Sequence, residues 1–231
     1  MFLSENTGLN AKAAREALIS IGRKIDEKGL VVGPGGNTSV RVGRLMYIKA
    51  SGKCFEDATE HDYVGVDLET GEVVDGDLKP SAEVLLHSGC YKARAEIEAV
   101  VHTHPPVATG LACAGRTVEP ISPDFVVLLG RTVPLAEYVV PTGPELAEVV
   151  TQAIRNHDAV LLRNHGLVTV GRTLREAFYR TLMVESAAVS MVAGTAMGKI
   201  RYLTPAEVDV IDNLQAEKYR RELLKKQAGG K

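Results

Sequence analysis

The chain has 231 residues, 45% of them hydrophobic, and 27 basic against 29 acidic side chains leave a formal net charge of −2. Such a chain can bury a substantial core, and we expect one domain over residues 1–231. No basic stripe indicates a nucleic-acid partner, and no apolar stretch reaches the roughly 20 residues of a membrane span. Cys54, Cys90 and Cys113 are widely spaced, which predicts free thiols and a cytoplasmic protein.

The first expected element is an amphipathic helix over residues 10–28, which Gly29 would end. Its buried face should consist of apolar residues at helical spacing, namely Ala14, Leu18, Ile21 and Ile25. The segment 31–40 follows, with three glycines within four positions and then Asn37-Thr38-Ser39. Such a backbone can turn its N–H groups toward an anion, although a plain tight turn is the simpler interpretation.

Two hairpins are expected next, one over 40–50 turning near Gly43 and one over 64–74 turning at 69–71. Ser51-Gly52-Lys53 follows the first hairpin. It is a second small loop with a hydroxyl group at a strand end, where an anion oxygen could be held.

Pro80-Ser81 opens a helix expected over 82–93, with Glu83 in its first turn and His87 four residues later. Residues four apart share one helix face, so His87 could orient the Glu83 carboxylate. A buried structural histidine is the simpler interpretation of His87. An acidic residue in a first turn also suits the helix dipole, so Glu83 has a structural explanation beside a chemical one.

An apolar run at 97–101 leads into His102-Thr103-His104, and Pro105-Pro106 should end that strand. Side chains two apart on a strand point to the same face, about 6.5–7 Å apart. Two imidazoles at this spacing can bind one ion through bonds of about 2 Å. The alternative is that both rings donate hydrogen bonds to backbone carbonyls.

A third histidine, His165, follows the apolar run 159–162 and precedes Gly166. Three histidines with an open fourth position are typical of catalytic zinc, although three imidazoles also suit cobalt, nickel, iron or copper. His61 and His157 stand among polar residues and are expected to be solvated.

The remaining elements are expected as a mixed sheet covered by helices. They are a short helix at 107–114, a loop at 120–125, strands at 126–129, 133–139 and 167–171, and helices at 144–156, 174–198 and about 205–225.

Four motifs occur in order: Gly36-Asn37-Thr38-Ser39, Pro80-Ser81-Ala82-Glu83, His102-Thr103-His104 and Asn164-His165-Gly166. With them the chain resembles the class II aldolase/adducin family, and within it the fuculose-phosphate-type aldolases. The resemblance implies a three-layer α/β/α fold around a mixed, largely antiparallel sheet. It also implies bound Zn²⁺ or another divalent metal, and a homotetramer with active sites near subunit contacts.

Carried over by motif, the resemblance makes His102, His104 and His165 the metal ligands and Glu83 the acid/base. The phosphate-binding positions it implies are Gly36, Asn37, Ser51, Gly52 and Ser81. The family often has a second serine where this chain has Ala82, so one phosphate hydrogen bond is missing here. A C-terminal tyrosine from a neighbouring subunit protonates the leaving aldehyde in such enzymes, and Tyr202 and Tyr219 are unassigned candidates.

The expected activity is reversible cleavage of a ketose 1-phosphate, similar to fuculose 1-phosphate, to dihydroxyacetone phosphate and a short aldehyde through a metal-stabilised enediolate. A ribulose-phosphate 4-epimerase is one alternative, because such enzymes have a catalytic aspartate before an aromatic residue, as in Asp124-Phe125. Asp124 could equally cap a turn. A dehydratase or decarboxylase is another alternative, since Ala82 leaves room for a carboxylate substrate. The last alternative is a non-catalytic, adducin-like module.

Overall fold

The computed structural model describes residues 10–217, 219 and 223. Its strands are β1 (Asn37–Val42), β2 (Leu45–Lys49), β3 (Tyr63–Asp67), β4 (Val73–Asp75), β5 (Ala99–Thr103), β6 (Leu135–Ala136), β7 (Ala159–Leu162) and β8 (Gly166–Gly171). Its helices are α1 (Ala11–Glu27), α2 (Val84–Ala93), α3 (Pro106–Cys113), α4 (Pro123–Leu129), α5 (Pro144–Ile154), α6 (Leu174–Met197) and α7 (Pro205–Asn213), with a 3₁₀ turn η1 (Glu60–Asp62).

The strands form one sheet in the order β4-β3-β2-β1-β5-β8-β7-β6. Within the described residues β6 and β7 run parallel, and the other neighbouring strands run antiparallel. Because β1, β5 and β8 lie side by side in the middle, the histidine-bearing end of β5 is flanked by a strand on each side.

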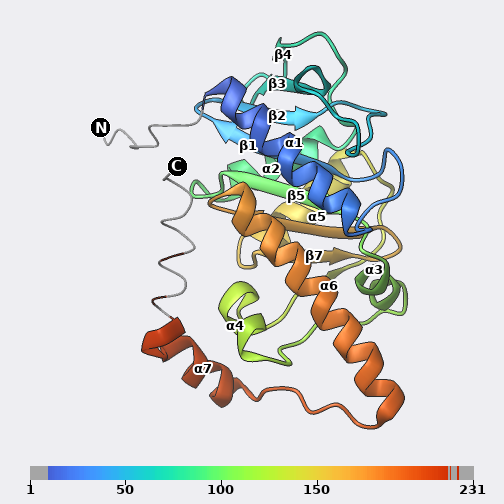
Figure 1. Cartoon of the computed structure of the whole chain (residues 1–231), viewed down its shortest axis with the longest axis vertical. Helices are drawn as coiled ribbons and strands as arrows, with labels where there is room; N and C mark the ends of the chain where they lie inside the picture. Colours follow the sequence, from blue (N-terminus) through green and yellow to red (C-terminus); the bar gives the residue numbers. More distant parts are fainter. Residues whose placement is uncertain (1–9, 218, 220–222, 224–231) are drawn as a thin grey trace.

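Helices cover both faces of the sheet (Figure 1). Alternate residues of β5 show the division, because Val101 packs with α1 and α6 while Val100 packs with α2 and α5. In α1 the four apolar residues expected on the buried face are all buried. These layers confirm the predicted α/β/α fold around a mixed, largely antiparallel sheet.

The two predicted hairpins are confirmed as β1–β2 and β3–β4. The strand predicted at 133–139 reduces to Leu135–Ala136, which pairs with β7. Glu83 is the N-cap residue of α2 and not part of its first turn. This position places the carboxylate beside the helix end instead of on the helix surface.

The loop predicted at 120–125 is confirmed only for residues 120–122, and the strand predicted at 126–129 is wrong, because residues 123–129 form α4. The Ser122 hydroxyl accepts a hydrogen bond from the Phe125 N–H, and Pro123 occupies the first helical turn. Phe125, Val126 and Leu129 are then buried at helical spacing. Short apolar runs suit either structure, and here the cap and the packing decide.

The last predicted helix is shorter than expected: α7 ends at Asn213, since Leu214 has an extended backbone with ψ 131°. Residues 215–217 are helical again, and the predicted end near residue 225 lies outside the described residues. In the described part of the chain, none of the helices has the length and apolar character needed to span a membrane. The three cysteines are free, as predicted.

Candidate metal centre

Three segments bring the predicted site residues together. His102 is in β5 and lies directly opposite Asn37 of β1, while His104 follows immediately after β5 ends. His165 lies in the turn that joins β7 to β8. Glu83 approaches from the N-terminal end of α2. Because side chains alternate along a strand, a register slip of one residue between β1 and β5 would turn Asn37 away from His102.

The three histidine rings converge, with one ring nitrogen from each within 4.8 Å of the others. The Nε2 atoms of His102 and His104 are 3.1 Å apart. The Glu83 carboxylate reaches into this group, with Oε2 3.2 Å from His102 Nε2 and Oε1 3.2 Å from His165 Nε2. Four side chains thus direct their donor atoms toward one small region.

The close approach of the two histidine-bearing segments depends on Gly166. A Cβ atom at this position would lie 2.4 Å from the Thr103 carbonyl oxygen and 2.6 Å from His104 Cδ2. The preceding Asn164 adopts φ 54°, a left-handed conformation that asparagine tolerates. The Asn164-His165-Gly166 motif is therefore a structural requirement for placing His165.

Burial sets the charge states at the centre. It lowers the pKa of His102, which is fully buried, and that of His104. Burial would raise the pKa of Glu83, but the nearby His102 and His165 and the Asn37 amide stabilise the carboxylate and hold its pKa below the usual range. The carboxylate is therefore ionised, and burial favours the neutral form of the His102 and His104 imidazoles.

This donor set fits a divalent metal ion. The Nδ1–H of His102 donates to the Leu167 carbonyl oxygen at 3.0 Å, which leaves the Nε2 lone pair free toward the other rings. Glu83 Oε1 and His165 Nδ1 are buried without a well-aligned hydrogen bond. Neutral imidazole nitrogens are preferred ligands of zinc and its neighbours.

The residues predicted to bind phosphate surround this centre unevenly. Asn37 is buried, and its Nδ2 donates to Glu83 Oε2 at 2.8 Å. Ser81 is buried too, and its Oγ accepts from the Glu83 N–H at 3.3 Å. Gly36, with φ +66°, lies against the His102 backbone, whereas Ser51 and Gly52 are exposed in the turn after β2.

Lys49 is a residue that sequence reasoning missed. Its side chain is buried, and its Nζ donates to the Pro34 carbonyl oxygen at 2.9 Å and to the Lys53 carbonyl oxygen. Burial lowers the pKa of Lys49 to about 8. The amine therefore joins the glycine-rich loop to the loop at 51–53. The sequence signal for this role was a lysine at the end of a predicted strand, just before the Ser51-Gly52 loop.

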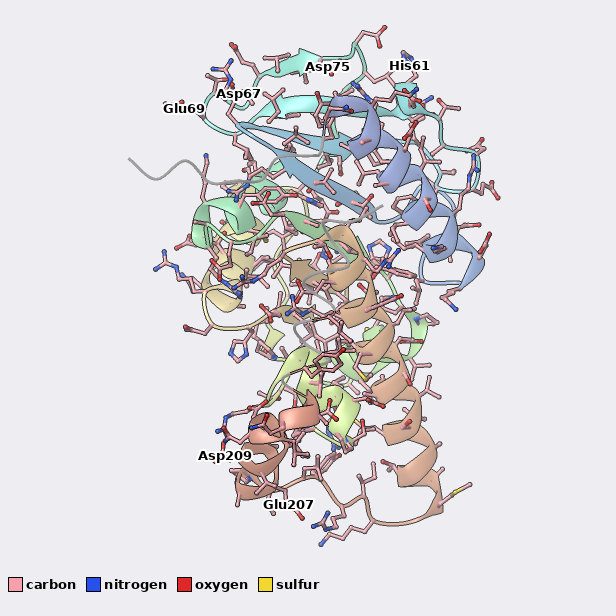
Figure 2. The ribbon with its side chains drawn as sticks, turned by 60° about the vertical axis from the view of Figure 1, so that its left-hand side comes forward. His61, Asp67, Glu69, Asp75, Glu207 and Asp209 are labelled. Atoms are coloured by element: carbon pink, nitrogen blue, oxygen red, sulfur yellow. The ribbon has the colours of Figure 1, made fainter. Side chains whose placement is uncertain are left out.

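Other candidates lie on different parts of the molecule. Asp124 is exposed in α4, which packs on α6 and α7. Tyr202 is partly buried beside the apolar cluster under α6, and Tyr219 is exposed. His61 is exposed as predicted, with its Nε2 3.7 Å from Asp77 Oδ1, and it lies at the opposite end of the molecule from Asp209 (Figure 2). His157, predicted to be solvated, is half-buried.

Comparison with known proteins gives consistent results. The family model described as "Class II Aldolase and Adducin N-terminal domain" matches residues 16–192. The 3-oxo-tetronate 4-phosphate decarboxylase of Haemophilus influenzae is 33% identical over 87% of this chain and 97% of its own length. The L-fuculose phosphate aldolase of Methanococcus maripaludis is 33% identical over 74% of this chain and 91% of its own length. A solved L-fuculose 1-phosphate aldolase superposes with a TM-score of 0.84 at 32% identity, covering 93% of this chain and 100% of that one.

Proposed function

The chain belongs to the class II aldolase and adducin family as one of its enzymes, and we propose that it is a zinc-dependent aldolase that reversibly cleaves a ketose 1-phosphate to dihydroxyacetone phosphate and a short aldehyde. The observation that carries this proposal is the convergence of His102, His104 and His165 on the Glu83 carboxylate. The names of the relatives supply the substrate class.

The chemistry needs two functions that these residues can provide. A divalent ion held by the three histidines would supply Lewis-acid stabilisation of the negative charge that develops when a carbon–carbon bond beside a carbonyl breaks. Glu83, ionised and restrained by the Asn37 amide, would take a proton from carbon or return it. General acid–base catalysis of this kind typically contributes 10²–10⁴-fold in rate.

The loops around the centre are suited to an anion. Gly36 and Ser81 flank Asn37 and Glu83, and the buried ammonium group of Lys49 contributes positive charge close enough to lower the pKa of His104, which burial lowers most. A phosphate held by these loops would fix the reacting carbons above the histidines, so that binding energy is used for orientation.

Product analysis tests the proposal. Zinc-loaded protein is incubated with dihydroxyacetone phosphate and either glycolaldehyde or lactaldehyde, beside the isosteric Glu83→Gln variant. We expect a new ketose 1-phosphate that is absent with the variant, lost on chelation and restored by zinc. Activity that persists in a strong chelator, or no condensation with any short aldehyde, would contradict it.

A decarboxylase is the second candidate, favoured by the similarity to the Haemophilus influenzae enzyme over 87% of this chain. Loss of CO₂ from a 3-oxo acid leaves the same kind of enediolate as aldol cleavage, and Glu83 could transfer to it a proton taken up from solvent. Ala82 in place of a second serine leaves room for a carboxylate substrate. Release of CO₂ from 3-oxo-tetronate 4-phosphate, without aldol activity, would establish this alternative.

The enzyme is also expected to assemble as a homotetramer and to work in the cytoplasm. Exposed apolar side chains along α6, namely Val189, Val192 and Met197, support an interface between subunits. The free thiols support a reducing compartment. Light scattering on the purified protein would test the assembly, and a monomeric mass would contradict it.

A further inference from the structure

A row of buried polar side chains joins β1 to α2, and it ends at the carboxylate of Glu83. On the strand side Asn37 and Ser39 are two residues apart, and on the helix side Glu83, His87 and Tyr91 are spaced by four. Two strand residues span about 6.7 Å and four helical residues about 6 Å, so the two rows match in spacing. We refer to these five residues as the β1–α2 row.

The hydrogen bonds in this row have a single consistent direction. Nδ2 of Asn37 donates to Glu83 Oε2 at 2.8 Å, since a carboxylate only accepts. The Asn37 Oδ1 atom therefore faces His87 Nε2, which must carry the ring proton. His87 Nδ1 then accepts from Ser39 Oγ at 2.7 Å, and Ser39 Oγ accepts from the Tyr91 hydroxyl at 2.7 Å.

Because the side chains of the row are buried, their polar groups depend on one another for hydrogen bonds. His87 and Ser39 are fully buried, and Asn37 and Tyr91 are 5% and 3% exposed. Burial also lowers the pKa of His87 to about 4, so its ring is neutral at neutral pH and carries one proton. A single proton cannot serve both ring nitrogens, and Asn37 Oδ1 already requires it on Nε2.

A reversed Asn37 amide would be unfavourable at both ends. Its Oδ1 atom would lie against the Glu83 carboxylate, and its NH₂ group would face the His87 N–H. Because an amide does not pass protons readily, the row is suited to orientation and not to proton transfer. It fixes which end of Asn37 faces the metal centre.

We infer that His87 is a positioning residue, whose Nε2–H locks the Asn37 amide with its NH₂ group toward Glu83 and so restrains the carboxylate beside the three histidines. One amide hydrogen of Asn37 goes to Glu83, and the other remains on the same side for the substrate. The inference rests on the proposed function only in the role that it gives Glu83.

The first arm of the test needs no substrate. Nitrogen NMR of the wild-type protein, metal-free and zinc-loaded, should show His87 with Nε2 protonated and Nδ1 unprotonated, and a slowly exchanging Asn37 side-chain amide. A Nδ1-protonated or doubly protonated His87 would overturn the inference. This result stands whether or not the protein is an aldolase.

The second arm compares two variants of similar polarity. His87→Gln keeps a donor near the Nε2 position, whereas His87→Asn keeps only a group near Nδ1. We expect His87→Gln to retain kcat within about threefold, and His87→Asn to lose at least about tenfold in kcat with KM within about twofold. Zinc affinity should stay unchanged in both.

Equal kcat for both variants, or a loss of zinc affinity that accounts for the effect, would overturn the inference. If wild-type protein makes no ketose phosphate, the proposed function fails. The NMR experiment alone then tests whether His87 orients the Asn37 amide. If His87→Asn does not fold, the NMR experiment on the wild-type protein is again the test.

Discussion

Two polar networks in this molecule are built in opposite ways. The β1–α2 row consists mainly of neutral groups in a directed series and ends at Glu83, whose Oε1 lacks a well-aligned hydrogen bond. On another part of the molecule, an arginine cluster is formed by Arg94, Asp158, Glu176 and Arg180. This cluster borders a cavity of about 660 Å³ whose lining mixes arginines and carboxylates.

The cluster satisfies its own charges. Arg180 pairs with Asp158 at 2.6 Å and with Glu176 at 3.0 Å. It also donates to the carbonyl oxygens of Leu128 and Val170, and so ties α6 to α4 and β8. The comparison indicates that the cluster stabilises the fold, whereas the β1–α2 row leaves reactive atoms available. The predictions below separate these two roles.

The largest effect is expected for Glu83→Gln. Removing the ionised carboxylate should lower kcat by about 10²–10⁴-fold, because the group that moves the proton is lost. The melting temperature should change little, since glutamine is nearly isosteric. Steady-state kinetics and thermal melts measure both. Activity near that of wild type would show that Glu83 is not the group that moves the proton.

The row should also make stability depend on pH. The pKa of His87 is about 4 in the folded protein, against about 6.5 unfolded, so between these values the unfolded chain binds more protons. Stability is therefore complete above pH 6.5 and falls as pH decreases toward 4, by about 3 kcal/mol from this group. Urea unfolding at several pH values measures the slope.

His102 and His104 titrate in the same direction, so the test uses the difference between wild type and His87→Gln. We expect the variant to lose part of the slope below pH 6.5. An unchanged slope would mean that His87 is not held neutral. The arginines of the cluster keep their charge throughout this range.

In the cluster, Arg180→Met should cost about 2–3 kcal/mol of stability, because Asp158 and Glu176 lose a partner that is only 12% exposed. Activity at low temperature should stay within twofold. Arg131→Met is the matched control, since its pair with Asp209 is more than half exposed and should contribute under about 0.5 kcal/mol. Lost activity with unchanged stability would make the cluster part of the site.

The smallest effect is expected at the far end of the row. Tyr91→Phe removes the hydroxyl that donates to Ser39, which should cost about 1 kcal/mol. The His87 tautomer should persist, because Ser39 still donates to Nδ1, so kcat should stay within threefold. A tenfold loss of kcat would show that the whole row, and not His87 alone, sets the orientation.

The motif residues could be found from sequence because they stand next to strand ends and glycines whose chemistry is local. His102 lies in β5 and His104 directly after its end, and His165 lies in a turn that Asn164 and Gly166 permit. The predicted strands and helices indicated a mixed sheet covered by helices, whereas the three-layer arrangement was implied by the resemblance to the family.

What could not be predicted depends on contacts between distant segments. His87 meets Ser39 only because of the face that β1 turns toward α2, and Lys49 is buried only once two loops close over it. The sequence 126–129 looked like a strand, and its helix is decided by the Ser122 cap and by the packing of Val126 on α7.

The most direct test of the central claim is solvent deuterium exchange into dihydroxyacetone phosphate, without any aldehyde. It asks only whether the metal centre and Glu83 move a proton at the carbon beside the carbonyl, whichever aldehyde the enzyme prefers. We predict that zinc-loaded wild type exchanges one of the two hydroxymethyl hydrogens, and that Glu83→Gln exchanges none. No exchange by the zinc-loaded wild type, or equal exchange by the variant, would contradict the account.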